Sequence, residues 1–232
     1  MVAILFVPGF MADRTLWDEV AACLDTTERL EFADLSVGSS IPEMARAVLA
    51  QTPGAFVLVG FSMGGYVARE MARLAPDRVR ALILIATSAR RDSPQQVQRK
   101  ADAVRHLSTA GFSGLGRASI QASLHPCRAQ DRELIERIRG MSARLGKAVF
   151  VRQATIQRDG DLGLLSQITC PTLVIAAAED RLRSIDESRE LVSRIPKAEF
   201  IVIPGSGHMI PMEKPDELAQ LISDWLKQVF GA

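Results

Sequence analysis

Short, continuous runs of apolar residues recur along this chain, and most of them are followed by a stretch with helical spacing. Val2–Val7 is the clearest of these runs. Because it does not alternate with polar residues, it predicts a strand that is buried on both faces of a sheet. Strands that alternate with helices predict a parallel sheet covered by helices on both faces. In such sheets the functional residues lie just beyond the carboxyl ends of the strands.

This alternation is interrupted once. Between Thr87 and Gln167 the chain shows helical stretches separated by Gly/Ser breaks such as Gly111–Gly116, with no strong strand pattern. We therefore expect an α/β core made by residues 1–88 and 166–232, split by a helical insertion at residues 89–165. The expected strands are Val2–Val7, Leu30–Leu35, Phe56–Val59, Val79–Ala86, Thr172–Ala177 and Glu199–Ile203. The expected helices are Trp17–Leu24, Ile41–Gln51, Gly64–Leu74, Gln95–Leu107, Asp131–Leu145, Lys147–Ile156, Ile185–Arg194 and Pro215–Val229.

The bulk composition excludes several classes of protein. The 232 residues are 47% hydrophobic and 24% charged, which is the make-up of an ordinary globular domain. The net charge of +1 and the lack of a basic stripe argue against a nucleic-acid partner. Cys23, Cys127 and Cys170 lie far apart and form no CxxC pair, so they predict neither a metal site nor a disulfide framework.

The sequence also argues against a membrane or secretory segment. The apolar start of the chain lacks a basic region and a small-residue cleavage site, and Pro8-Gly9 ends it. No apolar run approaches the roughly 20 residues that a membrane-spanning helix needs. These features predict a cytoplasmic protein that does not bind membranes.

The segment Gly60-Phe61-Ser62-Met63-Gly64-Gly65 carries the strongest chemical signal. It is a G-x-S-x-G pattern between an expected strand and an expected helix, which is the context this pattern requires. A serine at the tip of such a turn adopts strained backbone angles, and side chains at the flanking glycine positions would collide with neighbouring elements. The turn raises the hydroxyl above the sheet, next to helix N-terminal amides that favour negative charge. Ser62 is therefore the candidate nucleophile.

A serine hydroxyl needs a base to take its proton, and the chain has three histidines. His208 follows the last expected strand, in a loop that reaches the same edge of the sheet as Ser62. His106 and His125 fall in the helical insertion. We expect His208 to be the base, His106 to lie on the surface, and His125, which precedes Pro126, at most to line a pocket.

The base in turn needs a carboxylate that holds its tautomer. The expected strand Thr172–Ala177 is followed by Ala178-Glu179-Asp180. The chain order Ser, Asp, His matches the order expected for this type of site, so Asp180 is the preferred acid. Glu179 remains an alternative.

Two backbone N–H groups are needed to stabilise a developing oxyanion. One is expected from Met63, the residue after the nucleophile. The other is expected from Phe10, because Gly9 permits a turn in the loop that follows the first strand. Nothing in this set of residues calls for a metal or another cofactor.

Several of these motifs together resemble the α/β-hydrolase superfamily. They are Pro8-Gly9-Phe10, Trp17, Gly60–Gly65, Ala178-Glu179-Asp180, Gly205–Met209 and the tail Pro211–Leu226, and the resemblance covers nearly the whole chain outside the insertion. The tail and Leu84–Ser88 are similar to those of small bacterial esterases with a helical cap. The resemblance implies a three-layer fold, a catalytic triad, an acyl-enzyme mechanism without cofactor, and a cap domain over the pocket.

The chain departs from that family pattern in three places. Pro8 stands where many members have a histidine that props the oxyanion loop. The segment Asp34–Ser39 is looser than the usual Asp-x-x-Gly-x-Gly. The chain begins directly at a core strand, without the usual antiparallel hairpin, so the mostly parallel sheet should have about six strands rather than eight.

The cap should determine the substrate, and its sequence is the least informative part of the chain. A small apolar pocket could be formed, together with Phe10 and Met63, by Met11, Met141, Leu145, Phe150 and Met209. The three of these that lie in the insertion could instead simply pack the cap on the core. Arg144 and Arg152 could bind a carboxylate or a phosphopantetheine phosphate, or lie solvated on the surface.

These residues together predict a serine hydrolase, of the carboxylesterase type, acting on a small acyl substrate. A thioesterase, a lactonase or a C–C bond hydrolase would use the same residues, and the sequence does not separate them. A receptor that keeps the fold and binds a small molecule without significant turnover is the alternative from another class. The sequence leaves open whether the protein is a monomer or a homodimer.

Overall fold

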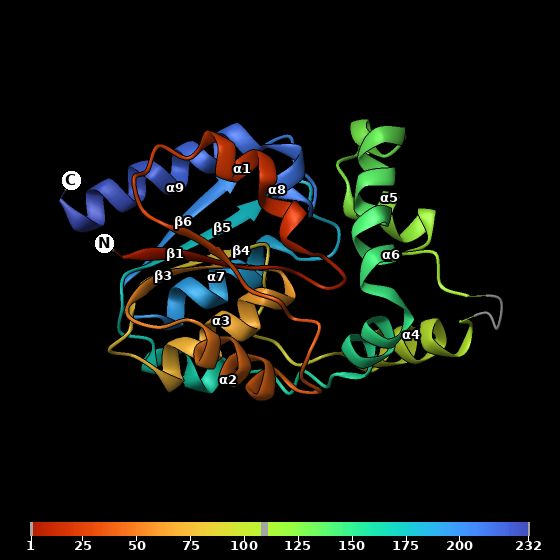
Figure 1. The fold of residues 1–232 in the computed structure, drawn as a ribbon, viewed down its shortest axis with the longest axis horizontal. Helices are drawn as coiled ribbons and strands as arrows, with labels where there is room; N and C mark the ends of the chain where they lie inside the picture. Colours follow the sequence, from red (N-terminus) through yellow and green to blue (C-terminus); the bar gives the residue numbers. More distant parts are fainter. Residues whose placement is uncertain (1, 108–110, 232) are drawn as a thin grey trace.

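A computed structural model describes residues 2–107 and 111–231, and within this part of the chain the core is a single parallel sheet (Figure 1). The sheet has six strands in the order β2-β1-β3-β4-β5-β6, and every neighbouring pair is parallel. The predicted fold class is therefore confirmed. The strands are β1 (Ala3–Val7), β2 (Leu30–Phe32), β3 (Phe56–Phe61), β4 (Val79–Ile85), β5 (Thr172–Ala177) and β6 (Ala198–Ile203).

Helices cover both faces of the sheet, which makes the three layers. On one face lie α1 (Asp18–Cys23), α8 (Ile210–Glu213) and α9 (Pro215–Phe230), and on the other lie α2 (Ile41–Gln51), α3 (Met63–Leu74) and α7 (Ile185–Arg194) (Figure 1). Successive strand residues alternate between these layers: Ile4 belongs to the buried cluster that contains Trp225, on the first face, and Leu5 to the one that contains Met71, on the second. Burial on both faces explains why the strands are continuously apolar.

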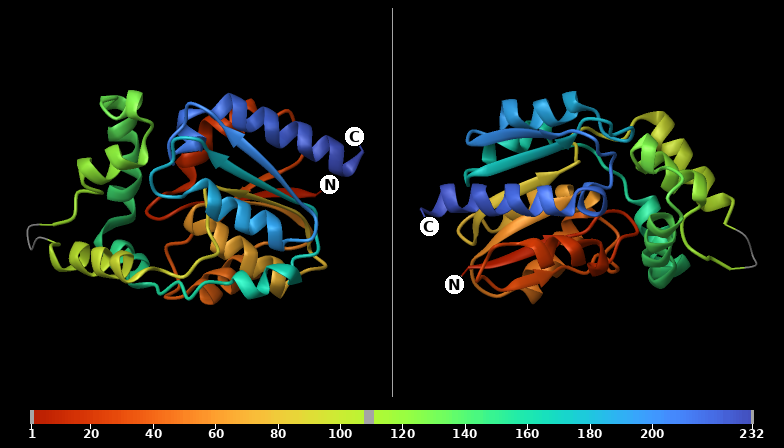
Figure 2. Two further views of the ribbon diagram at one scale, coloured as in Figure 1. Left: turned by 180° about the vertical axis from the view of Figure 1, so that it is seen from behind. Right: turned by 90° about the horizontal axis from the view of Figure 1, so that it is seen from above.

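In the described part of the chain, three α-helices lie apart from these layers, between β4 and β5 in sequence, and are called the cap below: α4 (Pro94–Arg105), α5 (Arg117–Ser123) and α6 (Arg132–Thr155). They stand beyond the carboxyl ends of the strands, toward which the arrowheads of β5 and β6 point (Figures 1 and 2). The predicted cap boundaries at residues 89 and 165 stay a prediction, and residues 108–110 of the predicted insertion lie outside the described residues.

The ends of several elements differ from the sequence prediction for local reasons. β2 ends at Phe32 rather than Leu35, because the Asp34 carboxylate accepts the Ser36 amide at 2.7 Å and turns the chain. The two helices predicted on either side of Gly146 form one α6, interrupted where Gly146 has φ 79° and ψ 176°. Short 3₁₀ turns, which have no clear periodic signal, occur at Arg14–Trp17, Pro126–Arg128 and Leu162–Gln167.

A buried ion pair anchors the end of the insertion to α3. The Asp161 carboxylate accepts two hydrogen bonds from the fully buried Arg69, at 2.8 and 2.9 Å, and a third from Arg73 at 2.8 Å. Burial alone would raise the pKa of the Asp161 carboxyl, but the adjacent Arg69 and Arg73 guanidinium groups outweigh burial and lower it. The chain leaving the cap is thus fixed against the helix that follows Ser62.

No helix in residues 2–107 and 111–231 combines the length and the apolar character needed to cross a bilayer.

Candidate active site

Ser62 occupies a strained turn between β3 and α3. Its φ of 51° and ψ of −112° lie outside the regions that most residues adopt. The surrounding structure holds this conformation through two backbone contacts. The Ser62 amide donates to the Ile85 carbonyl at 2.9 Å, and the Ser62 carbonyl accepts the Thr87 hydroxyl at 2.7 Å. Strain that is maintained in this way is typical of functional sites.

The glycines after Ser62 are required because the turn packs directly against the sheet. A Cβ added to Gly64 would lie 2.3 Å from the Val7 carbonyl oxygen, and one added to Gly65 would lie 2.5 Å from Thr87 Oγ1. Both distances are too short for any side chain. The close approach brings the N-terminus of α3 to the carboxyl end of β1, where the Pro8–Met11 loop begins.

Ser62, His208 and Asp180 form a chain of hydrogen bonds. His208 Nε2 lies 2.9 Å from Ser62 Oγ, and His208 Nδ1 lies 2.7 Å from Asp180 Oδ2. The Asp180 and His208 side chains are only 2% and 7% exposed. Since a carboxylate accepts, Asp180 holds the Nδ1–H tautomer, and Nε2 is left free to take the hydroxyl proton of Ser62.

In the loop that follows β5, the carboxylates of Glu179 and Asp180 point to different partners. Asp180 Oδ1 accepts the amides of Leu182 at 2.7 Å and Arg183 at 3.0 Å, which aims its other oxygen at His208. Glu179 instead accepts the Ser206 amide at 3.2 Å. Glu179, the alternative that the sequence leaves open, therefore points toward the backbone of the His208 loop and not toward the imidazole.

The loop that carries His208 is held partly by the cap. The His208 amide donates to the Ser123 carbonyl at 2.8 Å. The buried Glu213 carboxylate bridges the two segments, accepting the amides of His125 at 2.7 Å and Gly207 at 2.9 Å. Burial raises the pKa of the Glu213 carboxyl above its ordinary value, although these two amides act in the opposite direction.

The other two histidines make only local contacts. His106 Nδ1 donates to the Asp102 carbonyl at 2.7 Å from an exposed position at the rim of the cavity, and His125 Nδ1 accepts the Cys127 amide at 3.2 Å. Neither makes a hydrogen bond to Ser62 among the described residues. In the same part of the chain, no three Asp, Glu, His or Cys side chains gather closely enough to hold a metal ion.

The two predicted oxyanion donors lie on either side of Ser62. Met63 is the first residue of α3, and Phe10 follows Gly9, whose Cβ position would be 3.3 Å from Ser62 Cβ. Neither the Phe10 nor the Met63 amide has an acceptor among the residues that the structure describes. The next amide in the loop, that of Met11, donates to Gln153 Oε1 at 2.8 Å. The Phe10 and Met63 amides can therefore serve a substrate oxygen.

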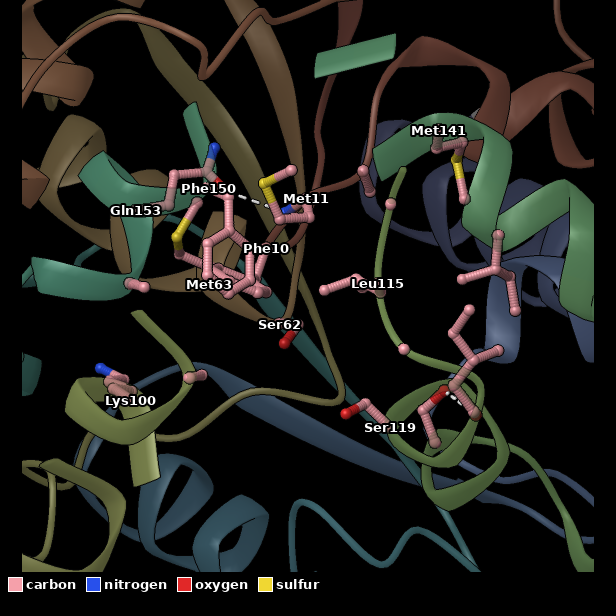
Figure 3. Close-up of a pocket in the computed structure, with 18 of the residues that line it drawn as sticks. Phe10, Met11, Ser62, Met63, Lys100, Leu115, Ser119, Met141, Phe150 and Gln153 are labelled. Carbon is pink, nitrogen blue, oxygen red and sulfur yellow. Dashed lines mark hydrogen bonds between the residues drawn. The ribbon is translucent and has the colours of Figure 1, made fainter. Parts of the chain in front are cut away.

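A cavity of about 700 Å³ opens over Ser62, between the sheet edge and the cap (Figure 3). Four of the predicted pocket residues line it: Met11, Met141, Phe150 and Met209. Leu145 does not line it, so that prediction is wrong. Leu145 directly precedes the break at Gly146, and it packs on a small apolar cluster with Val149 behind the cavity wall.

The sequence pattern does not identify several of the residues that line the cavity. Phe112 and Leu115 line the cavity from the Gly/Ser-rich stretch between α4 and α5, and Gln153 lines it from α6. Apolar residues between the glycines of that stretch are the only local signal that could have pointed to the first two. Gln153 had no such signal, because its partners are more than 110 residues away in the sequence.

The two cap arginines considered as anion ligands connect the cap to the core instead. Arg144 Nε donates to Asp13 at 2.8 Å, and Arg152 donates to the Ser36 carbonyl. Neither is among the residues that line the cavity.

Comparisons with known proteins identify the fold and the family of the chain. A family model described as the alpha/beta hydrolase fold matches residues 39–215. A pimeloyl-[acyl-carrier protein] methyl ester esterase from Yersinia enterocolitica is 30% identical over 201 residues, covering 82% of this chain and 76% of that protein.

Two solved structures extend the comparison. A thermophilic esterase from Thermogutta terrifontis, solved with malate bound, matches with a TM-score of 0.82 and 32% identity, over 99% of this chain and 90% of that one. The enol-lactonase from Burkholderia xenovorans LB400 matches with a TM-score of 0.84 over 97% of this chain and 91% of that one. At 20% identity, this second likeness concerns the fold.

Proposed function

The chain belongs to the α/β-hydrolase family, and we propose that it is a serine esterase that cleaves a carboxylic ester of a small substrate through an acyl-enzyme. The observation that carries this proposal is the hydrogen-bonded series Ser62–His208–Asp180, of which Ser62 and His208 line the cavity. The names of the relatives support an ester as the bond cleaved, since two of them are esterases.

In the proposed mechanism Ser62 Oγ attacks the ester carbonyl carbon while His208 Nε2 takes the hydroxyl proton. The tetrahedral oxyanion accepts the Phe10 and Met63 amides. The imidazolium, stabilised by Asp180, gives its proton to the departing alkoxide, which leaves as the alcohol. Water then attacks the acyl-enzyme, with His208 again as the base, and releases the acid and the serine hydroxyl.

A fluorophosphonate probe tests the nucleophile without knowledge of the natural substrate. We expect one covalent adduct on Ser62, located by peptide mass spectrometry, together with multiple turnovers of a short p-nitrophenyl ester. A chain that binds acyl compounds tightly but completes no more than one turnover would instead be a receptor.

A panel of esters, thioesters and lactones of graded chain length then orders the substrate classes. We expect the highest kcat/KM with esters. A thioester or lactone preference would keep the site and change the assigned bond.

The cytoplasmic location, and a monomeric or homodimeric state without a nucleic-acid partner, stay predictions of the sequence.

A further inference from the structure

One wall of the cavity is basic. Among the described residues that line it are Arg99, Lys100, Arg158 and Arg183, but no aspartate or glutamate. These cations come from α4, from the chain that leaves α6 and from the loop after β5. Three distant segments therefore bring positive charge to one cavity whose remaining surface is largely apolar.

The counter-ions of this wall lie behind it. Asp92 forms ion pairs with both Lys100 and Arg158, and its side chain is only 6% exposed. Glu187 contacts Arg183 at 3.4 Å and also caps α7. Among the residues that the structure describes, two carboxylates thus pair with three cations, while Arg99 adds a fourth positive charge.

The electrostatics of Lys100 reflect this imbalance. Burial lowers the pKa of its ammonium, and repulsion from Arg158 and, more weakly, Arg183 lowers it further, against the opposing attraction of Asp92. An anion placed in the cavity would relieve this repulsion. Lys100 lies on α4 at one side of the cavity that contains Ser62 (Figure 3).

We propose that Lys100, Arg158 and Arg183 form a subsite for an anionic group, a carboxylate or a phosphate, on the part of the substrate that does not react. This inference rests on the proposed esterase function and specifies its substrate class. The apolar surface around Met63 and Phe150 takes the chain between the ester and the anion. Charge-assisted hydrogen bonds to such a group are the stronger kind, so the subsite selects substrates that carry it.

The test compares methyl esters of one chain length that end in a methyl group, a carboxylate or a phosphate. We expect kcat/KM for the better anionic ester to exceed that for the neutral one by about tenfold or more. Whether carboxylate or phosphate is favoured identifies the source of the anion. Ser62-dependent hydrolysis without any preference for an anionic ester would overturn the subsite and leave the esterase intact. Failure to hydrolyse any of the three would overturn both.

Variants at Lys100 link the preference to the wall. In Lys100→Gln the ratio of kcat/KM for the anionic ester to kcat/KM for the neutral ester should fall about tenfold, because the cavity loses one positive charge. The ion pair between Asp92 and Arg158 remains in this variant. Lys100→Arg should retain most of the ratio. Lys147→Gln removes the same charge from an exposed position on α6 and should leave the ratio unchanged. An unaltered ratio in Lys100→Gln would contradict the assignment.

A second, independent observation concerns Gln153. This side chain from α6 is 2% exposed; its Oε1 accepts the Met11 amide at 2.8 Å and its Nε2 donates to the Leu35 carbonyl at 3.0 Å. Met11 has φ 54°, in the left-handed region that is strained for a non-glycine residue. Figure 3 shows Gln153 and Met11 joined beside Phe10.

We infer that Gln153 is a positioning residue for the oxyanion site. By holding the Met11 amide, it keeps this loop in its strained form and leaves the preceding Phe10 amide for the substrate. Pro8, within the loop itself, cannot hold the loop by a side-chain hydrogen bond, because a proline side chain has no polar group. Gln153 provides that hydrogen bond from the cap. The oxyanion site is then complete only when α6 is seated on the core.

Gln153→Met keeps the size and removes both hydrogen bonds. We expect kcat to fall about 10- to 100-fold with KM changed much less, because a misplaced donor weakens the transition state more than the ground state. The affinity for an alkyl boronic acid, which forms a tetrahedral adduct on Ser62, should fall in parallel. Gln153→Glu keeps an acceptor for Met11 and should retain more activity. A loss confined to KM or to thermal stability, or an unchanged kcat, would overturn the inference.

Discussion

Replacing Ser62 with alanine should reduce kcat for a short p-nitrophenyl ester by about 10⁴- to 10⁶-fold, which is the typical loss of kcat when an activated serine nucleophile is removed. The residual rate would come from the two oxyanion amides and from substrate binding, which the substitution leaves in place. The fold should survive, because alanine keeps the Cβ and the same backbone contacts to Ile85 and Thr87. The free energy of unfolding should therefore change by less than about 1 kcal/mol.

The measurement is steady-state hydrolysis together with thermal unfolding and fluorophosphonate labelling. Ser193 provides a matched control, since its hydroxyl is exposed and contacts only the Glu190 carbonyl among the described residues. Ser193→Ala should label and turn over like the unaltered protein. Appreciable turnover by Ser62→Ala, in a sample that the probe does not label, would contradict Ser62 as the nucleophile.

Asp180→Asn is expected to lower kcat by about 10⁴-fold while preserving the site's shape. An asparagine oxygen can still accept the Leu182 and Arg183 amides. Its NH₂ group would then face His208 Nδ1 as a donor, which leaves Nε2 protonated and unable to accept from Ser62. The loss should therefore appear in kcat with little change in thermal stability.

Glu179→Gln is the matched control for this experiment, because the two acids are adjacent in sequence and point to different partners. The amide oxygen that this substitution introduces can still accept the Ser206 amide, so kcat should change by no more than about threefold. If Glu179→Gln lost more activity than Asp180→Asn, the assignment of the acid would have to be reversed.

The sheet and its layers could be predicted from the sequence because each strand and helix is encoded locally. Continuous apolar runs mark the buried strands, and Gly60–Gly65 marks the turn between β3 and α3. Placing Ser62, Asp180 and His208 after strand ends required only the rule that parallel strands share one carboxyl edge. The structure brings these three within hydrogen-bond distance of one another.

The cap could not be predicted to the same depth. The lining of the cavity depends on how α4, α5 and α6 pack over the sheet edge, and that packing joins residues far apart in the chain. Leu145 shows the difficulty: it shares a helix with Met141, but the break at Gly146 follows it and its side chain does not reach the cavity. The Lys100–Asp92–Arg158 cluster is likewise invisible until the two ends of the insertion meet.

The contact between the Ser123 carbonyl and the His208 amide has a consequence for how such proteins diversify. A lid that merely covered its cavity could be exchanged between relatives as an independent module. Here the lid also supports the loop that carries the histidine, and Glu213 bridges both segments. A chimera with a foreign lid would therefore have to reproduce the backbone path at Ser123–His125. Changes of specificity by point substitution within the lid avoid that requirement.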